Sequence, residues 1–208
     1  MPASDPEPPS LKTRCLLIGN SRWHWAEMAA NGLRCWHEAP VAGLATARRL
    51  APLAWAAVGP VPAGAVLDPA NRLSCADVPL RDLPPWLGID RALAGWQAWR
   101  EEPNRPVLVA DAGTVLSLTR VDRGGRFAGG RLLAGLGLQL RAMAAGTAAL
   151  PDLNPELSPL NGAESSTDRW PAATAAAMLQ GVSRGLVAAI AAAAVEVDEA
   201  EEIGRAHV

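Results

Sequence analysis

Two tight turns, each containing glycine and each lying between two strand patterns, constrain the fold of this chain most strongly. The first turn is Gly19-Asn20-Ser21, which follows an apolar run at residues 14–18. The second is Asp111-Ala112-Gly113-Thr114, which follows a similar run at residues 106–110. Glycine has no Cβ, so backbone N–H groups in such a turn can approach an anion closely, and Ser or Thr adds a hydroxyl donor. The two patterns predict an α/β protein with a phosphate-binding turn on each wall of one cleft.

The remaining patterns complete two halves of similar organisation, residues 11–105 and 106–201. Short or alternating apolar runs predict further strands at residues 22–27, 33–37, 55–58 and 115–121. Apolar residues at helical spacing predict helices at residues 41–50, 90–101, 136–145 and 172–195. No strand is assigned after residue 121, where a Gly-rich turn leads to residues 126–128 and then to Gly129-Gly130. Residues 1–10 are predicted to be a disordered tail.

The composition is that of a globular chain without a strong charge. Half of the 208 residues are apolar, and the net charge is −2, so neither nucleic acid nor a membrane surface is expected as the main partner. Three scattered cysteines, Cys15, Cys35 and Cys75, indicate reduced thiols rather than disulfides or a zinc site. The longest apolar run, residues 186–195, is shorter than the roughly 20 residues that span a bilayer. With no signal peptide at its start, the chain is expected to be cytoplasmic.

Two common nucleotide-binding motifs are absent. The chain has no G-x-x-x-x-G-K-[ST] sequence, and Lys12 is its only lysine. Gly135-Leu136-Gly137 is followed by Leu140 where a dinucleotide-binding loop needs its third glycine. Taken singly, either phosphate-type turn is more often an ordinary hairpin turn, and Asp90 is more often a residue of the first helical turn. The functional interpretation therefore depends on several motifs in order.

Five motifs in order make the chain resemble the type III pantothenate kinases. They are Gly19-Asn20-Ser21, Gly88-Ile89-Asp90-Arg91, Asp111-Ala112-Gly113-Thr114-Val115, Gly129-Gly130-Arg131-Leu132-Leu133-Ala134-Gly135 and Thr174-Ala175-Ala176-Ala177-Met178-Leu179-Gln180-Gly181. The residues around Gly19 and Asp90 are similar to those of the cyanobacterial branch. The resemblance implies an actin-like ATPase fold, with two ribonuclease-H-like lobes and a nucleotide cleft between them. It also implies phosphorylation of pantothenate by ATP, the first step of coenzyme A biosynthesis.

The resemblance implies roles for individual residues. Asp90 would be the general base that takes the proton of the pantothenate hydroxyl, and Arg91 would bind the pantothenate carboxylate. Asp111 would help to hold a monovalent cation, K⁺ or NH₄⁺. The residues implied to bind pantothenate are Gly88, Ile89, Asp90, Arg91 and Thr174. Those implied to bind the phosphates of ATP, which arrives with Mg²⁺, are Gly19, Asn20, Ser21, Gly113 and Thr114. A homodimer is implied because the family builds its pantothenate pocket across a dimer interface.

Several departures from the family pattern affect these expectations. Leu17 stands where the family has an aspartate associated with Mg²⁺ and phosphate, and Ala173 replaces an asparagine. The chain contains no tyrosine, although some members place one near pantothenate. Family members continue with a further strand, a Gly-Gly turn and a helix, whereas this sequence stops after residue 208. Residues 202–208 are expected to be a non-native tail.

Two alternatives stay open. A non-catalytic regulatory protein of the same fold, which binds nucleotide without turnover, is favoured by Leu17 and by the missing end. Another actin-like kinase with a different small acceptor is the second alternative, against which the Gly88-Ile89-Asp90-Arg91 motif argues. His24 and His37 are interpreted as structural residues, since no spacing of acids and histidines supports a metal site.

Overall fold

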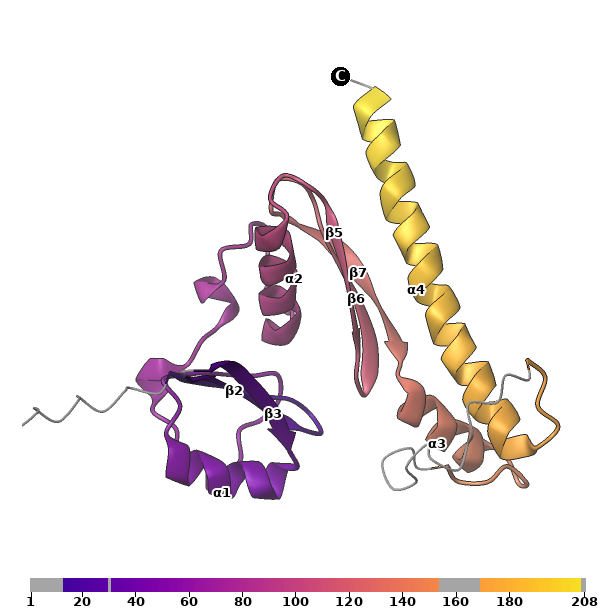
Figure 1. Ribbon diagram of the computed structural model, residues 1–208, viewed down its shortest axis with the longest axis horizontal. Helices are drawn as coiled ribbons and strands as arrows, with labels where there is room; N and C mark the ends of the chain where they lie inside the picture. Colours follow the sequence, from indigo (N-terminus) through magenta and orange to yellow (C-terminus); the bar gives the residue numbers. More distant parts are fainter. Residues whose placement is uncertain (1–12, 30, 154–168, 207–208) are drawn as a thin grey trace, which may run out of the picture. The chain divides into compact units, whose positions relative to one another are not determined.

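The computed structural model describes residues 13–29, 31–153 and 169–206, which form two compact units (Figure 1). Unit 1 holds the residues up to Val78 together with Pro85–Asp90, and unit 2 holds Pro79–Pro84 and the residues from Arg91 onward. The tail expected at residues 1–10 lies outside the described residues. The expected boundary between the lobes, after residue 105, follows helix α2 (Ile89–Glu101), whereas most of that helix is counted with unit 2.

Unit 1 is built on a four-stranded sheet of order β3-β2-β1-β4. Strands β1, β2 and β3 are antiparallel neighbours, and β4 runs parallel to β1, as expected of a ribonuclease-H-like lobe. The elements are β1 (Arg14–Ile18), β2 (Trp23–Ala29), β3 (Gly32–Glu38), α1 (Pro40–Leu50) and β4 (Ala54–Ala57), followed by the short 3₁₀ turns η1 (Pro69–Asn71) and η2 (Cys75–Asp77). The strands and the helix predicted for this half are confirmed to within two residues.

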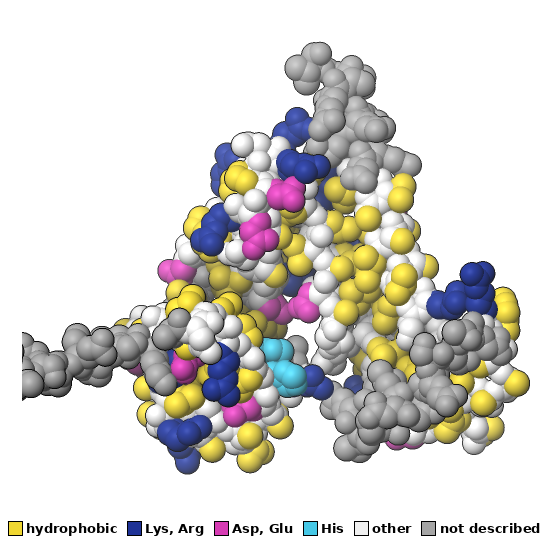
Figure 2. Space-filling model, in the orientation of Figure 1, with side chains coloured by type: hydrophobic (Ala, Val, Ile, Leu, Met, Phe, Trp, Pro, Cys, Tyr) yellow, Lys and Arg dark blue, Asp and Glu magenta, His cyan; other side chains and the backbone are white. Residues whose placement is uncertain are grey.

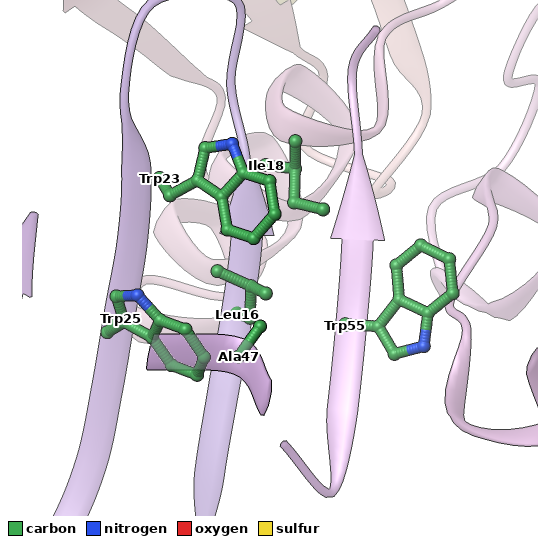
Figure 3. Packing of buried hydrophobic residues seen from close by; sticks show 6 residues of the cluster. All are labelled: Leu16, Ile18, Trp23, Trp25, Ala47 and Trp55. Carbon is green, nitrogen blue, oxygen red and sulfur yellow. The ribbon is translucent and has the colours of Figure 1, made fainter. Parts of the chain in front are cut away.

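Alternation along the strands of unit 1 gives the sheet one buried face. Leu16 and Ile18 of β1 and Trp23 and Trp25 of β2 alternate with more exposed residues, and their buried side chains pack with Trp55 of β4 and with α1. The buried members of this core are Leu16, Ile18, Trp23, Trp25, Ala47 and Trp55 (Figure 3). Helix α1 approaches closely because Gly43 lies against Trp23, where a Cβ would be 2.7 Å from the indole ring.

Unit 2 contains an antiparallel sheet of order β5-β6-β7 and two further helices (Figure 1). Its elements are α2, β5 (Val107–Ala112), β6 (Val115–Val121), β7 (Phe127–Ala134), α3 (Leu136–Gly146) and α4 (Thr174–Ala206). Leu116 and Leu118 of β6 pack with Ala193 of α4 on one face. On the other face, Gly95 of α2 lies against Val121 and Thr119. The sheet thus has a helix on each face, which confirms the expected α/β class.

Strand β7 was missed by the sequence patterns because glycines interrupt it. Gly129 and Gly130 lie inside the strand, where Gly130 pairs with Thr119 of β6. The register shifts between Thr119 and Val121, and Gly129 has a φ of +100°. These are the features of a β-bulge, in which a glycine adopts a conformation that other residues avoid. The pair Gly129-Gly130 therefore bends a strand rather than marking a loop.

Helix α4 is longer than predicted and continues to Ala206 instead of ending near residue 195. Its segment Thr174–Val197 is long and apolar enough to cross a membrane by length and composition, so the expectation that no segment reaches that length is wrong. In unit 2 this helix packs through Met178 and Val182 on Leu140 of α3 and through Ala193 on the sheet. Arg131 of β7 also donates a hydrogen bond to Glu196 Oε1 (3.1 Å). Only 17% of its most apolar 18-residue stretch is buried, so these contacts cover one side of the helix.

Candidate functional site

The first phosphate-type turn connects β1 and β2 in unit 1. The N–H of Gly19 donates to the carbonyl of Arg22 (2.9 Å), which closes the turn. A Cβ on Gly19 would lie 2.8 Å from that carbonyl oxygen, so the tight turn requires glycine. The side chains of Asn20 and Ser21 are exposed at its tip. The turn therefore presents an amide and a hydroxyl to solvent on a rigid backbone.

The second turn connects β5 and β6 in unit 2 and is supported from behind by Gly135. Gly113 N–H donates to Val115 O (3.2 Å), and Gly135 N–H donates to Thr114 O (2.9 Å). A Cβ on Gly135 would lie 2.1 Å from Gly113 O and 2.7 Å from Thr114 O. Since these are backbone atoms, no other residue fits at position 135 without displacing the turn. The glycine that ends the fourth motif thus holds the third motif in place.

Asp90 lies in the first turn of α2, and Gly88 leaves room for its carboxylate. A Cβ at position 88 would lie 2.5 Å from Asp90 Oδ1, so glycine provides the space that the carboxylate occupies. Cys75 is a neighbour: its Sγ–H donates to Leu87 O (3.3 Å), and burial, followed by the Asp90 charge, raises the pKa of the thiol. The raised pKa keeps Cys75 protonated, so no second negative charge arises beside Asp90.

Arg91 follows Asp90 on the same helix and is held against the sheet of unit 2. Its Nε donates to Thr119 Oγ1 (3.0 Å), and its Nη2 lies 3.4 Å from Leu118 O. Its Cζ is 5.9 Å from the ring centroid of Phe127. A Cβ on Gly130 would be only 2.3 Å from Arg91 Nη2, so this glycine also leaves room for the guanidinium. Three neighbouring groups therefore determine where the arginine points.

Asp111 and Arg91 lie on the same face of the unit 2 sheet. Asp111 is an exposed residue of β5 and pairs directly with Ser117 of β6. Side chains two residues apart on a strand point to the same side, so Ser117 shares a face with Thr119, which binds Arg91. The second and third motifs thereby meet on one surface. Thr174, by contrast, is the exposed first residue of α4.

The candidate residues fall in both units. The turn Gly19-Asn20-Ser21 and the stretch Gly88-Ile89-Asp90 belong to unit 1. Arg91, Asp111, the turn Gly113-Thr114 and Thr174 belong to unit 2. Each unit therefore contributes one phosphate-type turn and part of the motif around Asp90.

The residues near the two turns fit the expected monovalent cation better than they fit a protein-bound Mg²⁺ ion. Within the described ranges, no group of three or more His, Cys, Asp or Glu side chains is placed to hold a metal ion. Mg²⁺ prefers carboxylate and other oxygen ligands, and position 17 beside the first turn offers only a leucine. A Mg²⁺ ion held by a protein carboxylate at this turn does not fit. Asp111 supplies one exposed carboxylate beside the second turn, and an oxygen ligand of this kind suits a monovalent cation.

Two contacts near the candidate site were not predicted from the sequence. Thr119 of β6 is only 1% exposed, and a buried hydroxyl implies a polar partner, which is Arg91. That signal was present in the sequence of β6. The pairing of His24 with His37 on neighbouring strands required the register of the sheet.

Comparisons with known proteins identify the family. Residues 76–196 match the family model of type III pantothenate kinase. The chain is 39% identical over 181 residues to the type III pantothenate kinase of Thermosynechococcus vestitus, covering 85% of this chain and 68% of that protein. It is 35% identical to the Synechococcus elongatus enzyme (84% and 74% covered) and 38% identical to the Synechocystis enzyme (84% and 68% covered). The expected resemblance to the cyanobacterial branch is confirmed, and the chain belongs to the type III pantothenate kinase family.

Proposed function

We propose that this chain phosphorylates pantothenate with ATP to give 4′-phosphopantothenate, the first step of coenzyme A biosynthesis. The observation that carries the proposal is the motif Gly88-Ile89-Asp90-Arg91, in which Gly88 leaves space for the Asp90 carboxylate while Thr119 holds Arg91. Membership of the type III pantothenate kinase family supports the choice of both substrates.

In the proposed reaction, Asp90 accepts the proton of the pantothenate hydroxyl as its oxygen bonds to the γ-phosphorus of ATP. The bond from the γ-phosphorus to the bridging oxygen breaks, and ADP leaves. Phosphoryl transfer depends mostly on positioning and charge stabilisation, so a carboxylate is a sufficient base. Arg91 binds the pantothenate carboxylate, with Gly88 and Ile89 beside it and Thr174 lining the pocket.

The phosphates of ATP are bound by the two turns in this proposal. The side chains of Asn20, Ser21 and Thr114 are the donors, together with backbone N–H groups of the turns that are not used to close them, while Gly19 and Gly113 let the phosphates approach the backbone. Asp111 would hold K⁺ or NH₄⁺, and Mg²⁺ arriving with the nucleotide would neutralise phosphate charge. The enzyme is proposed to act in the cytoplasm as a homodimer, without a nucleic-acid or membrane partner.

The test is pantothenate-dependent release of ADP by the 208-residue chain. The proposal expects release only when both substrates are present, and Asp90→Asn should lower the single-turnover rate by about 10²–10⁴-fold. Pantothenate binding should change little in that variant, because the amide keeps the shape of the carboxylate. Turnover by Asp90→Asn at the wild-type rate would remove Asp90 from the role of base.

One observation favours a second function, nucleotide binding without turnover. Leu17 removes the carboxylate that the family uses beside the first turn. A chain of that kind would bind ATP with pantothenate present or absent and would release no ADP. The same assay therefore separates the two functions, and an acceptor screen tests whether a different small alcohol replaces pantothenate.

A further inference from the structure

A group of basic side chains lies beside the first turn on the exposed face of the unit 1 sheet. Leu17 pairs with His24, and His24 pairs with His37, so these residues point to the same side of neighbouring strands. The imidazole centroids are 6.2 Å apart, and Arg22 Nη1 lies 3.4 Å from His37 Nε2. We call Arg22, His24 and His37 the imidazole patch, and Figure 2 shows its histidines as one cyan area.

The imidazole patch adjoins the turn that is proposed to bind phosphate. A Cβ on Gly19 would lie 3.7 Å from His24 Nε2, which places the ring next to the turn backbone. Both histidines are exposed, and Arg22 directly follows the turn. A phosphate bound at Gly19 would therefore be within reach of the ring N–H groups and the guanidinium.

The acidic residues of this sheet are on its opposite face. Glu27 pairs with Arg14, which donates to its carboxylate (2.6 Å), and Glu38 accepts a hydrogen bond from Thr46 of α1 (3.0 Å). On the patch side, the described strand residues of the sheet include no acid, and Leu17 is apolar. Because the patch side has basic side chains and no acid among these strand residues, it favours an anion.

We propose that the imidazole patch binds the terminal phosphates of ATP directly, on the side of the sheet where Leu17 places no carboxylate. An aspartate at position 17 would repel polyphosphate unless a cation lay between them. With Leu17 that repulsion is gone, and His24 and Arg22 donate hydrogen bonds straight to phosphate oxygens. Polyphosphate binding at the first turn therefore needs no metal ion held there by a protein carboxylate. The inference rests on the proposed function only in identifying the first turn as a phosphate site.

The test measures binding of inorganic tripolyphosphate, and of ATP in EDTA, to the 208-residue chain by titration calorimetry. His24→Ala and Arg22→Gln should each raise the dissociation constant about tenfold, the effect of losing one charge-assisted hydrogen bond. His24→Gln should recover part of the affinity, since its amide can still donate. The matched control is Arg34→Gln, because Arg34 pairs with Glu27 in register and so lies on the opposite face. Circular dichroism confirms that each variant is folded.

The outcomes separate this inference from the proposed function. Wild-type affinity in His24→Ala, or an equal loss in Arg34→Gln, overturns the inference even if the chain phosphorylates pantothenate. Absence of tripolyphosphate binding by the wild type also overturns it. If the chain binds tripolyphosphate through the patch but releases no ADP with pantothenate, the inference stands and the proposed function fails.

Discussion

At the scale of single residues, Arg91 is placed by a buried hydroxyl. Thr119 is 1% exposed and accepts the hydrogen bond of Arg91 Nε. Thr119→Val keeps the volume but removes the acceptor, so the guanidinium loses its orientation. We expect KM for pantothenate to rise about tenfold while kcat changes little, because a ground-state contact is weakened. Steady-state kinetics check this.

Two variants serve as controls for this prediction. Thr119→Ser keeps a hydroxyl and should restore a KM close to that of the wild type. Ser117→Ala changes another buried hydroxyl on the same face of β6 and should leave KM unchanged. If Thr119→Val has the same KM for pantothenate as the wild type, the contact between Thr119 and Arg91 does not position the substrate.

Asp111 leads to a prediction about monovalent cations. An exposed carboxylate beside the Gly113-Thr114 turn would repel polyphosphate unless a cation separated them. Replacing K⁺ by Na⁺ or choline should therefore slow ADP release sharply, and Asp111→Asn should flatten that dependence. Equal rates in all three salts would count against a cation at this position.

Cys75 offers a chemical probe of the Asp90 carboxylate. Burial is the larger cause that raises the pKa of this thiol, and the Asp90 charge is the second. Less thiolate forms at a given pH, so Cys75 should react slowly with iodoacetamide at mildly alkaline pH. In a variant in which the exposed Cys15 and Cys35 are replaced, Asp90→Asn should speed alkylation of Cys75, because the negative charge of Asp90 is removed. An unchanged rate, measured by mass spectrometry, would show that the charge does not act on the thiol.

At the scale of elements, the packing of the β7–α3 connection on the β5–β6 turn depends on Gly135. Gly135→Ala would place a methyl group 2.1 Å from Gly113 O, and backbone atoms cannot yield as a side chain can. We expect this variant to lose several-fold in affinity for ATP and to unfold at lower urea concentration. The control is Gly181→Ala in α4, because the structure has no neighbouring atom within 4 Å of a Cβ added at that position. That change should stabilise the chain by about 1 kcal/mol, because alanine is the better helix former. If both variants bind ATP equally well and unfold at the same urea concentration, Gly135 does not support the Gly113-Thr114 turn.

At the scale of the whole molecule, each unit has its own hydrophobic core. Leu16 belongs to the core of unit 1, and Leu118 belongs to the core between β6 and α4 in unit 2. Leucine-to-alanine substitution at either buried site should cost about 2–5 kcal/mol. Hydrogen exchange should then accelerate in β1–β4 for Leu16→Ala and in β5–β7 for Leu118→Ala. Acceleration of both sheets by either change would show that the units unfold as one.

Local patterns predicted most of the elements and failed where backbone geometry departs from regular structure. The alternation of Trp23 and Trp25 identified β2 to within two residues, and the helical spacing identified α2 to within one residue. Strand β7 escaped because Gly129 and Gly130 carry no apolar alternation, although the bulge lets them remain in the sheet. The end of α4 was missed because its apolar pattern fades into acidic residues while the backbone continues as a helix.

The sequence by itself determined the family, the two strand–turn–strand starts and the identity of Asp90 and Arg91 as candidates, because these depend on short contiguous motifs. The tertiary structure decided which residues from distant parts of the chain meet. Sheet register placed His24 opposite Leu17, and strand alternation placed Asp111 on the face that holds Arg91. The need for glycine at positions 130 and 135 likewise came from atoms far along the chain. The alternation of side chains along a strand and the residue types of a turn are local properties of the sequence. The register between strands and the close contacts between backbone segments are set only when the strands pair.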